Sequence, residues 1–241
     1  MKYKGVLFDV DSTLTETEGI DLLAHSSPYA VDVSRITDRA MRGELDFEAA
    51  LRERVSLLKD LDVDVIERAI ENTVVSHLAL ETILKLKEYG LKIGVVSGGF
   101  REIIDRIFHN WPLDLVVAHQ LSTAGGKLTG QIQGEIVDRE KKKETLELFA
   151  AQIGCSVDEM IAVGDGSNDI SMVQRAGLGI AYRAKPSLRA VADVIQDSLN
   201  GQGEAYRWGG EEFVLLLPAP VNAPAVIEQV RREIVARHFS G

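Results

Sequence analysis

Short apolar runs alternate with helical segments along most of this chain, and this alternation is the strongest constraint on its fold. The first run, YKGVLFDVD (3–11), contains β-branched and aromatic residues and ends in carboxylates, as buried strands often do. Further strands are predicted at 91–99, 113–120, 159–166, 178–182 and 193–196, with helices at 80–89, 100–110, 141–153, 168–176 and 186–192. Repeated strand–helix units predict an α/β fold with a doubly wound parallel sheet.

One long segment, 15–75, interrupts the alternation. Stretches such as FEAALRERVSLL (47–58) have helical periodicity, and no strand candidate of comparable quality lies between them. We interpret 15–75 as a small helical insertion into a core formed by 1–14 and 76–198. Later in the chain, GGKLTGQIQGEIV (125–137) alternates polar and apolar residues around glycines, which predicts an exposed hairpin.

Three of the predicted strands end in polar residues that could form one site. These ends read FDVDST, VVSGG and VGDGSND. In a doubly wound sheet, ligands bind at the carboxyl ends of the strands, so neighbouring strands would bring the three ends together. Acidic or glycine-rich turns are common after single strands, but their joint occurrence in this order favours a functional site.

The carboxylates at these ends predict a metal-assisted phosphoryl site. Asp9 and Asp11 point the same way while the strand continues, so they require a cation or a shared proton. Asp165 and Asp169 add negative charge, and such a cluster of oxygen ligands favours Mg²⁺. With the metal bound, one carboxylate can attack phosphorus while a neighbouring carboxyl protonates the leaving oxygen and then activates water.

Other polar groups are suited to binding the phosphate itself. Ser97, followed by Gly98 and Gly99, offers a hydroxyl and backbone N–H groups at the start of a helix. The run REKKKE (139–144) offers three lysines, 141 to 143, as compact positive charges. The charge pattern alone favours an ordinary solvated helix end for at least two of these three lysines.

Composition limits the partners of this chain. Its 241 residues allow one sizeable α/β domain plus an insertion or appendage, and the net charge of −10 argues against nucleic acid or an anionic membrane as the main partner. The single cysteine, Cys155, excludes internal disulfides and fits a reducing cytosol. No apolar run approaches the ~20 residues of a membrane span, and the N-terminus does not read as a signal peptide. We therefore expect a cytoplasmic protein that acts on a small molecule.

These motifs resemble the haloacid dehalogenase superfamily of aspartyl-phosphate phosphatases, and within it the phosphoserine phosphatases, over residues 3 to about 195. The resemblance implies hydrolysis of O-phosphoserine in serine biosynthesis, with Mg²⁺ as cofactor. It implies Asp9 as the nucleophile and Asp11 as the general acid/base. Ser97 and Lys142 would bind the phosphate. Metal ligands would come from Asp9, the Asp11 backbone carbonyl and Asp165, with Asp169 in support.

The insertion resembles the small cap of that family, which closes over the active site. By position, Glu18 would bind the substrate ammonium and Arg54 its carboxylate, a pairing suited to guanidinium geometry. Met41 and Phe47 would form walls of the pocket. Asn168 would contact phosphate or substrate.

The C-terminal residues resemble a different family. AYRWGGEEFVLLLP (205–218) resembles the active-site hairpin of GGDEF diguanylate cyclases, and a predicted helix at 225–238 resembles the helix that follows it. A glycine-rich linker is predicted at 199–204. The remaining chain is too short for a cyclase, and NGQG (200–203) lacks the arginine and aspartate of that family's product-inhibition motif. We interpret 205–241 as a GGDEF-like fragment, a β-hairpin plus helix, that packs on the core or mediates homo-oligomerisation.

Two alternatives remain open from the sequence. The first is a relative in the same superfamily that hydrolyses another small phosphomonoester or transfers its phosphoryl group to an alcohol. The second is a module that binds guanine-nucleotide messengers through the C-terminal fragment.

Overall fold

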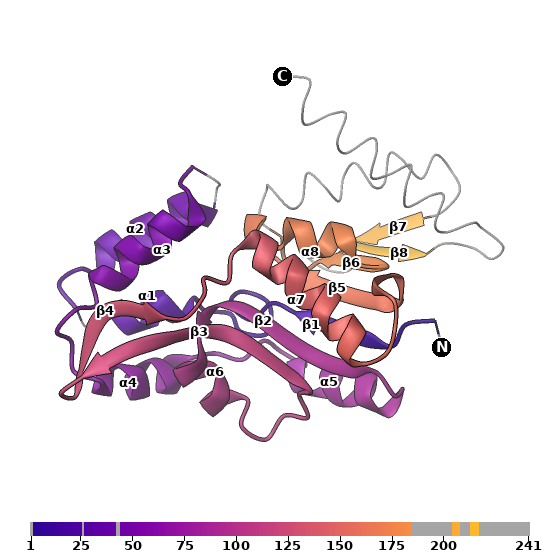
Figure 1. Ribbon diagram of the computed structural model, residues 1–241, viewed down its shortest axis with the longest axis horizontal. Helices are drawn as coiled ribbons and strands as arrows, with labels where there is room; N and C mark the ends of the chain where they lie inside the picture. Colours follow the sequence, from indigo (N-terminus) through magenta and orange to yellow (C-terminus); the bar gives the residue numbers. More distant parts are fainter. Residues whose placement is uncertain (1, 26, 42–43, 185–203, 208–212, 217–241) are drawn as a thin grey trace.

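The computed structural model describes residues 2–25, 27–41, 44–184, 204–207 and 213–216, and its centre is a six-stranded sheet (Figure 1). The strand order is β4-β3-β2-β1-β5-β6, in which only β4 is antiparallel to its neighbour. The strands are β1 (Gly5–Phe8), β2 (Lys92–Phe100), β3 (Leu115–Ala124), β4 (Lys127–Gln133), β5 (Met160–Gly164) and β6 (Leu178–Ala181). This arrangement confirms the predicted α/β fold.

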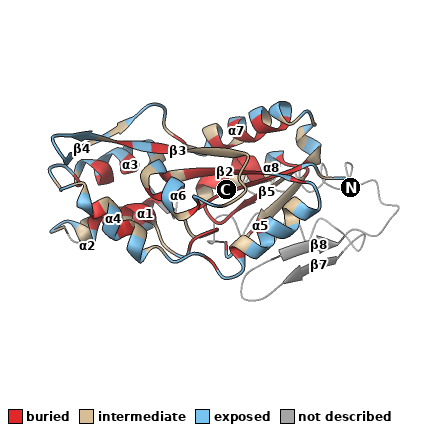
Figure 2. Cartoon of the chain, turned by 90° about the horizontal axis from the view of Figure 1, so that it is seen from below, coloured by how far each residue is buried: buried red, intermediate tan, exposed pale blue. Residues whose placement is uncertain are grey.

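Helices cover both faces of the sheet, as Figure 1 shows. On one face lie α5 (Ala79–Glu88) and α6 (Arg101–Ile107), and on the other α7 (Arg139–Gln152) and α8 (Ile170–Arg175); two short 3₁₀ turns, η1 (Val157–Glu159) and η2 (Ser167–Asp169), flank β5. Alternation along β1 explains both layers, because successive side chains of a strand point to opposite faces. Val6 packs in the cluster that holds Ile83 of α5, whereas Leu7 packs in the cluster that holds Phe149 of α7. Buried residues accordingly follow the central strands in Figure 2.

Four helices form a cap between β1 and α5 in the sequence. They are α1 (Gly19–Ala24), α2 (Ala30–Met41), α3 (Phe47–Ser56) and α4 (Asp64–Asn72). Their apolar faces share one cluster, in which Leu23, Val33 and Leu51 are at most 1% exposed. Asp46 caps α3 by accepting a hydrogen bond from the Ala49 N–H at 2.8 Å. The predicted helical insertion is therefore present as a small layer, and its apolar cluster also includes Phe100, Leu121 and Leu128 of the sheet.

The hairpin of β3 and β4 differs from the sequence prediction. We expected an exposed hairpin within 125–137, but β4 pairs with the end of β3, and the turn is at Gly125 and Gly126, whose φ angles are 59° and 78°. Leu128 of β4 is only 2% exposed, because it packs into the cap cluster. The Asp60 N–H also donates to the Leu128 carbonyl at 2.9 Å. The hairpin is therefore a support for the cap, which the local alternation of residue types does not indicate.

Of the predicted C-terminal fragment, the structure describes two short strands. β7 (Glu204–Arg207) and β8 (Phe213–Leu216) pair in antiparallel fashion, as expected for the hairpin. The predicted linker at 199–204 ends in Glu204, which begins β7 instead. The rest of the linker, the predicted elements at 186–192, 193–196 and 225–238 and the glycine-rich turn lie outside the described residues, as do the side chains of both strands. Homo-oligomerisation through the hairpin therefore stays a prediction. Among the helices of the described part of the chain, none has the length and apolar character that crossing a membrane requires.

Candidate active site

The site lies where the chain reverses its direction across the sheet. From β1 the chain continues to β2 and β3 on one side, and it later returns to β5 and β6 on the other. Such a switch point leaves a crevice at the carboxyl ends of the two central strands. Asp9 follows β1 directly and Asp165 follows β5 directly, so both residues lie at this crevice. Each has an oxygen within 4.8 Å of the other and of Asp169.

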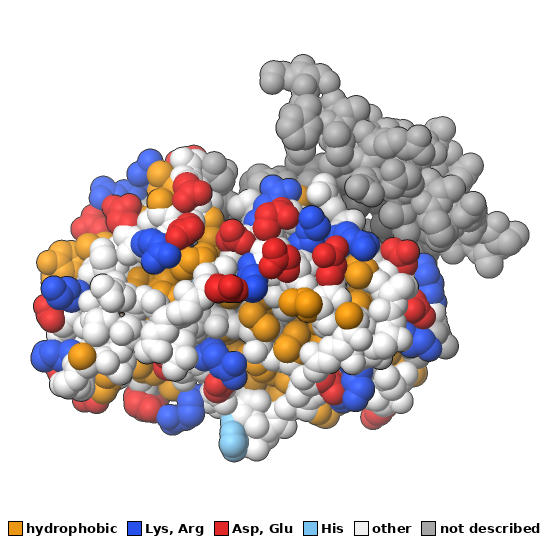
Figure 3. Space-filling model, viewed as in Figure 1, with side chains coloured by type: hydrophobic (Ala, Val, Ile, Leu, Met, Phe, Trp, Pro, Cys, Tyr) orange, Lys and Arg blue, Asp and Glu red, His pale blue; other side chains and the backbone are white. Residues whose placement is uncertain are grey.

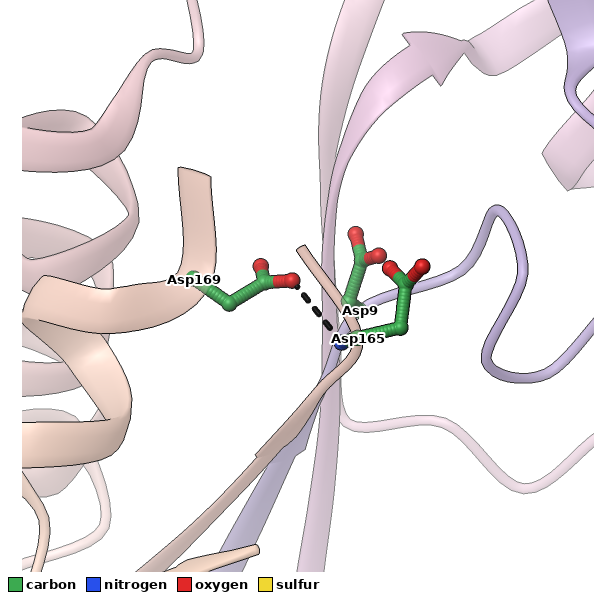
Figure 4. A group of neighbouring side chains, drawn as sticks. All are labelled: Asp9, Asp165 and Asp169. Atoms are coloured by element: carbon green, nitrogen blue, oxygen red, sulfur yellow. Dashed lines mark hydrogen bonds between the residues drawn. The ribbon is translucent and has the colours of Figure 1, made fainter. Parts of the chain in front are cut away.

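Asp169 supports the other two carboxylates rather than sharing their orientation (Figure 4). Its Oδ2 accepts hydrogen bonds from the backbone N–H groups of Asp165 at 3.0 Å and Gly166 at 2.9 Å, and its Oδ1 accepts one from Lys142 at 2.6 Å. Gly164 allows this approach, because a Cβ there would collide with the Asp169 carboxyl group. With Asp169 thus engaged, Asp9 and Asp165 are the carboxylates best placed to hold a cation.

Lys142 is the single buried cation of the lysine run. Its side chain is 0% exposed, and Nζ lies 2.6 Å from an oxygen of Asp9 and 2.6 Å from an oxygen of Asp169. Burial lowers the pKa of Lys142, but the adjacent charges of Asp169 and Asp9 outweigh it and raise the pKa. Lys141 and Lys143 pair with glutamates nearer the surface. Figure 3 shows acidic and basic side chains intermingled on this face of the molecule.

The charges of this cluster do not balance without a cation. Three carboxylates, those of Asp9, Asp165 and Asp169, surround one ammonium, which gives a formal charge of −2 when all are ionised. Burial raises the pKa of Asp9 well above its usual value, and the charges of Asp169 and Asp165 raise it further against the opposing effect of Lys142. A divalent ion that prefers oxygen ligands would restore neutrality, so the donor set fits Mg²⁺. The Asp11 backbone carbonyl stays a predicted ligand.

Asp11 has the properties of a general acid/base. Burial, followed by the nearby charge of Glu18, raises its pKa to about 7, although the Gly19 N–H donates to Asp11 Oδ1 at 3.1 Å and favours the ionised form. A carboxyl group with such a pKa can both give and take a proton at neutral pH. The raised pKa also explains how two neighbouring carboxyl groups, Asp9 and Asp11, can take different roles.

The predicted phosphate-binding residues occupy an irregular part of β2. Pairing with β3 is regular up to Val96 and resumes only at Phe100, so the intervening Ser97, Gly98 and Gly99 leave the ladder. Ser97 Oγ accepts a hydrogen bond from the Gly99 N–H at 2.8 Å. A Cβ on Gly99 would lie 2.6 Å from Asp11 Oδ2, so glycine there leaves room for the Asp11 carboxyl group. Gly98 similarly allows Phe47 of the cap to approach, since a Cβ added at Gly98 would lie 3.1 Å from the Phe47 ring.

The cap and the core together line one pocket. From the core it is lined by Asp9, Asp11, Gly98, Gly99, Ser167 and Asn168, and from the cap segment by Glu18, Ile20, Ala40, Phe47, Leu51 and Arg54. Figure 3 shows a notch between the lobe that carries α2 and α3 and the lobe that carries α7. The structure therefore brings the predicted residues Glu18, Phe47, Arg54 and Asn168 to the same space as Asp9. Met41 ends α2, and its side chain lies outside the described part of the structure.

His119 belongs to this site but was not singled out by the sequence. It lies on β3, is 1% exposed, and its ring bridges two segments. The Val137 N–H can only donate, so His119 Nε2 accepts this bond at 2.7 Å, and Nδ1–H donates to the Gly98 carbonyl at 3.0 Å. The neutral ring thus joins the phosphate loop to the segment that precedes Lys142. A lone histidine in a strand pattern gives no signal of such a role, because its partners are 18 and 21 residues distant.

The buried ring predicts a pH-dependent stability. Burial, reinforced by the charges of Lys142 and Arg54, lowers the pKa of His119 to about 4, whereas an unfolded chain binds this proton near pH 6.5. The unfolded state therefore binds more protons between these values, and the free energy of unfolding falls as pH drops from about 6.5 to 4, by at most about 3 kcal/mol from this group. Urea denaturation at several pH values in this range should show that the free energy of unfolding changes less with pH for His119→Gln than for the wild type. The exposed His109→Gln is the matched control, and a His119→Gln slope equal to that of the wild type would contradict the prediction.

Comparison with known proteins gives consistent results over the same part of the chain. A phosphoserine phosphatase of Methanocaldococcus jannaschii is 45% identical over 193 residues, which are 80% of this chain and 92% of that protein. One of Archaeoglobus fulgidus is 46% identical over 188 residues, but these cover only 55% of that longer protein. A solved structure described as a phospho-aspartyl intermediate analogue of phosphoserine phosphatase has a TM-score of 0.75 and 45% identity, and the match covers 78% of this chain and 90% of that one.

Two family models match the chain. The diguanylate cyclase GGDEF domain matches residues 185–240, in agreement with the resemblance of the C-terminal fragment, although most of these residues lie outside the described part. The model described as haloacid dehalogenase-like hydrolase matches residues 3–177, the range that contains Asp9, Ser97, Lys142 and Asp165. With the relatives above, this match supports a phosphomonoester hydrolase. The chain belongs to the haloacid dehalogenase-like hydrolase family.

Proposed function

We propose that this protein hydrolyses O-phospho-L-serine to serine and inorganic phosphate. The observation that carries the proposal is the pocket in which the Asp9 and Asp11 carboxyl groups share one space with the ionic side chains Glu18 and Arg54. The first pair can break a phosphate ester, and the second pair can recognise the ammonium and carboxylate of an amino acid. The phosphoserine phosphatase relatives support the same substrate.

The proposed reaction has two displacements at phosphorus. An Asp9 carboxylate oxygen attacks phosphorus, the bond from phosphorus to the serine oxygen breaks, and Asp11 gives its proton to that oxygen. Asp11 then takes a proton from water, whose oxygen attacks the phosphorus of the aspartyl phosphate and releases the Asp9 carboxylate. An Asp11 pKa of about 7 suits both steps.

Charge stabilisation would come from several groups around the phosphate. Lys142 Nζ lies 2.6 Å from Asp9 and would place a positive charge beside the nucleophile, and Ser97 Oγ, which accepts the Gly99 N–H, keeps its own proton to donate to a phosphate oxygen. Mg²⁺ held by Asp9 and Asp165 would, when bound, reduce repulsion between the nucleophile and the phosphate oxygens. Asn168 Oδ1, an acceptor, is buried without a hydrogen-bond partner among the described residues, which is consistent with a ligand group that donates a hydrogen bond at this position.

The test is phosphate release from O-phospho-L-serine with Mg²⁺ and again with excess EDTA. We expect metal-dependent turnover, and a kcat/KM at least about tenfold above that for O-phosphoethanolamine, which lacks only the carboxylate that Arg54 would bind. Glycerol 3-phosphate and p-nitrophenyl phosphate complete the panel, with and without an added alcohol to detect phosphoryl transfer. If the protein hydrolysed another ester of the panel as fast as phosphoserine or faster, the proposed substrate would be wrong.

The GGDEF match at 185–240 favours guanine-nucleotide binding as a second candidate function. Calorimetric titration of the full chain with GTP and with a cyclic guanine dinucleotide tests it. The absence of binding heat at high nucleotide concentration would exclude this function, whatever the outcome of the phosphatase assay.

A further inference from the structure

Three polar side chains from three different cap helices form a hydrogen-bonded chain that leads from the pocket residue Arg54 through buried Thr37 to half-buried Asp21. Arg54 of α3 is 5% exposed and lines the pocket, and Thr37 of α2 is 3% exposed. Arg54 Nη1 donates to Thr37 Oγ1 at 3.0 Å, and Arg54 Nε donates to the Ala50 carbonyl at 3.2 Å. Thr37 Oγ1 in turn lies 2.9 Å from Asp21 Oδ1, on α1.

The donors and acceptors of this chain can be assigned from the chemistry of the groups. A guanidinium only donates, so Thr37 Oγ1 accepts from Arg54 and has one proton left to donate. Two oxygens are within reach, Asp21 Oδ1 at 2.9 Å and the Val33 carbonyl at 3.0 Å. An ionised carboxylate is the stronger acceptor, so the hydroxyl proton is directed to Asp21.

We propose that Thr37 and Asp21 are positioning residues that orient the Arg54 guanidinium and thereby select phosphomonoesters that carry a carboxylate. The proposal rests on the phosphoserine phosphatase function above. Fixing Nε against Ala50 and Nη1 against Thr37 defines the plane of the guanidinium, because these two nitrogens belong to one rigid group. A planar group held in this way meets a carboxylate with little further loss of side-chain freedom.

The hydroxyl between Arg54 and Asp21 matters for affinity. A carboxylate that paired directly with Arg54 would occupy the donors that a substrate carboxylate needs. With Thr37 as intermediary, Asp21 favours the charged, ordered guanidinium while the link to Asp21 takes a bond from Nη1 alone. Burial lowers the pKa of Arg54, and the negative charges of Glu18 and Asp21 oppose this effect. The two carboxylates therefore offset part of the cost of burying the guanidinium.

The experiment compares two substrates in matched variants. Thr37→Val removes the hydroxyl at nearly constant shape, and Thr37→Ser restores it. For Thr37→Val we expect KM for O-phospho-L-serine to rise about tenfold, while kcat/KM for O-phosphoethanolamine stays within about twofold. Thr37→Ser should resemble the wild type on both substrates. Thr73→Val is the control for the cap, because the Thr73 hydroxyl, directly after α4, donates to the Ala69 carbonyl of that helix and lies outside the chain to Arg54.

The outcomes separate a positioning role of Thr37 from a general effect on the cap. An equal loss on both substrates in Thr37→Val, as from a loosened cap, would overturn the proposal, and so would no loss on either. Wild-type turnover of phosphoserine tests the proposed function by itself. Mobility of the Arg54 Nε–H group, from ¹⁵N relaxation of the ligand-free protein, tests the positioning without turnover. It should increase in Thr37→Val but not in Thr37→Ser, and unchanged mobility would overturn the proposal even if phosphoserine is not the substrate.

Discussion

Replacing Lys142 with methionine is expected to reduce both the stability and the activity of this protein severely. Methionine has a similar length, so the change removes the charge rather than the volume. It leaves Asp9 and Asp169, 3% and 0% exposed, without their shared cation. Breaking a buried ion pair from one side costs about 3–5 kcal/mol, because the remaining charges stay buried. Loss of the positive charge near the phosphate should also lower kcat by about 10²–10³-fold.

Lys143→Met provides the matched control, because Lys143 lies next to Lys142 on the same helix but is 38% exposed and pairs with Glu140 at 3.3 Å. Such a surface pair contributes about 0–1 kcal/mol, so its variant should remain close to the wild type in urea denaturation with EDTA present. Addition of Asp169→Asn to Lys142→Met should recover part of the lost stability, since it removes one of the stranded charges. Similar unfolding midpoints for Lys142→Met and Lys143→Met would refute the buried-cluster account.

The parts of the fold that the sequence predicts are those set by local patterns. The run before Asp9 is apolar because β1 is covered on both faces. Carboxylates come directly after it because β1 ends at the crevice. The sequence prediction misplaced the β3–β4 hairpin, because this element is set by distant contacts rather than by a local pattern. Its register depends on contacts of Leu128 with cap residues far away in the sequence, and alternation around glycines cannot reveal such contacts.

The site shows the same division between local and distant information. Asp9, Asp11 and Asp165 are visible in the sequence because each follows a strand, and the order of the three strand ends adds to the signal. Thr37 and Asp21 are not visible, because each resembles a surface residue of an amphipathic helix. Only the packing of α1, α2 and α3 against one another joins them to Arg54 in one hydrogen-bonded chain. Residues that act through other residues are therefore the ones that a sequence pattern omits.

Asp9→Asn is expected to lower the rate of phosphate release by at least about 10⁴-fold, because an amide cannot act as the nucleophile. The fold should persist, since asparagine has nearly the shape of aspartate and Lys142 keeps its 2.6 Å bond to Asp169. Stability in urea with EDTA should stay within about 1 kcal/mol of the wild type or rise, because the variant relieves repulsion among buried carboxylates. Lys142→Met is thus expected to lose much of the stability and about 10²–10³-fold in kcat, whereas Asp9→Asn is expected to keep its stability and lose at least about 10⁴-fold in rate.

The covalent step can be tested directly on the same variant. Wild-type protein quenched in acid during turnover should carry one phosphoryl group on the peptide that contains Asp9, and Asp9→Asn should carry none. Asp32→Asn, at a surface carboxylate of α2 that pairs with Arg35 of the same helix, should be labelled and active like the wild type. Normal turnover by Asp9→Asn would show that water attacks phosphorus directly or that another residue is the nucleophile. The Asp9–Lys142–Asp169 cluster would then serve to bind the phosphate and the metal without forming a bond to phosphorus.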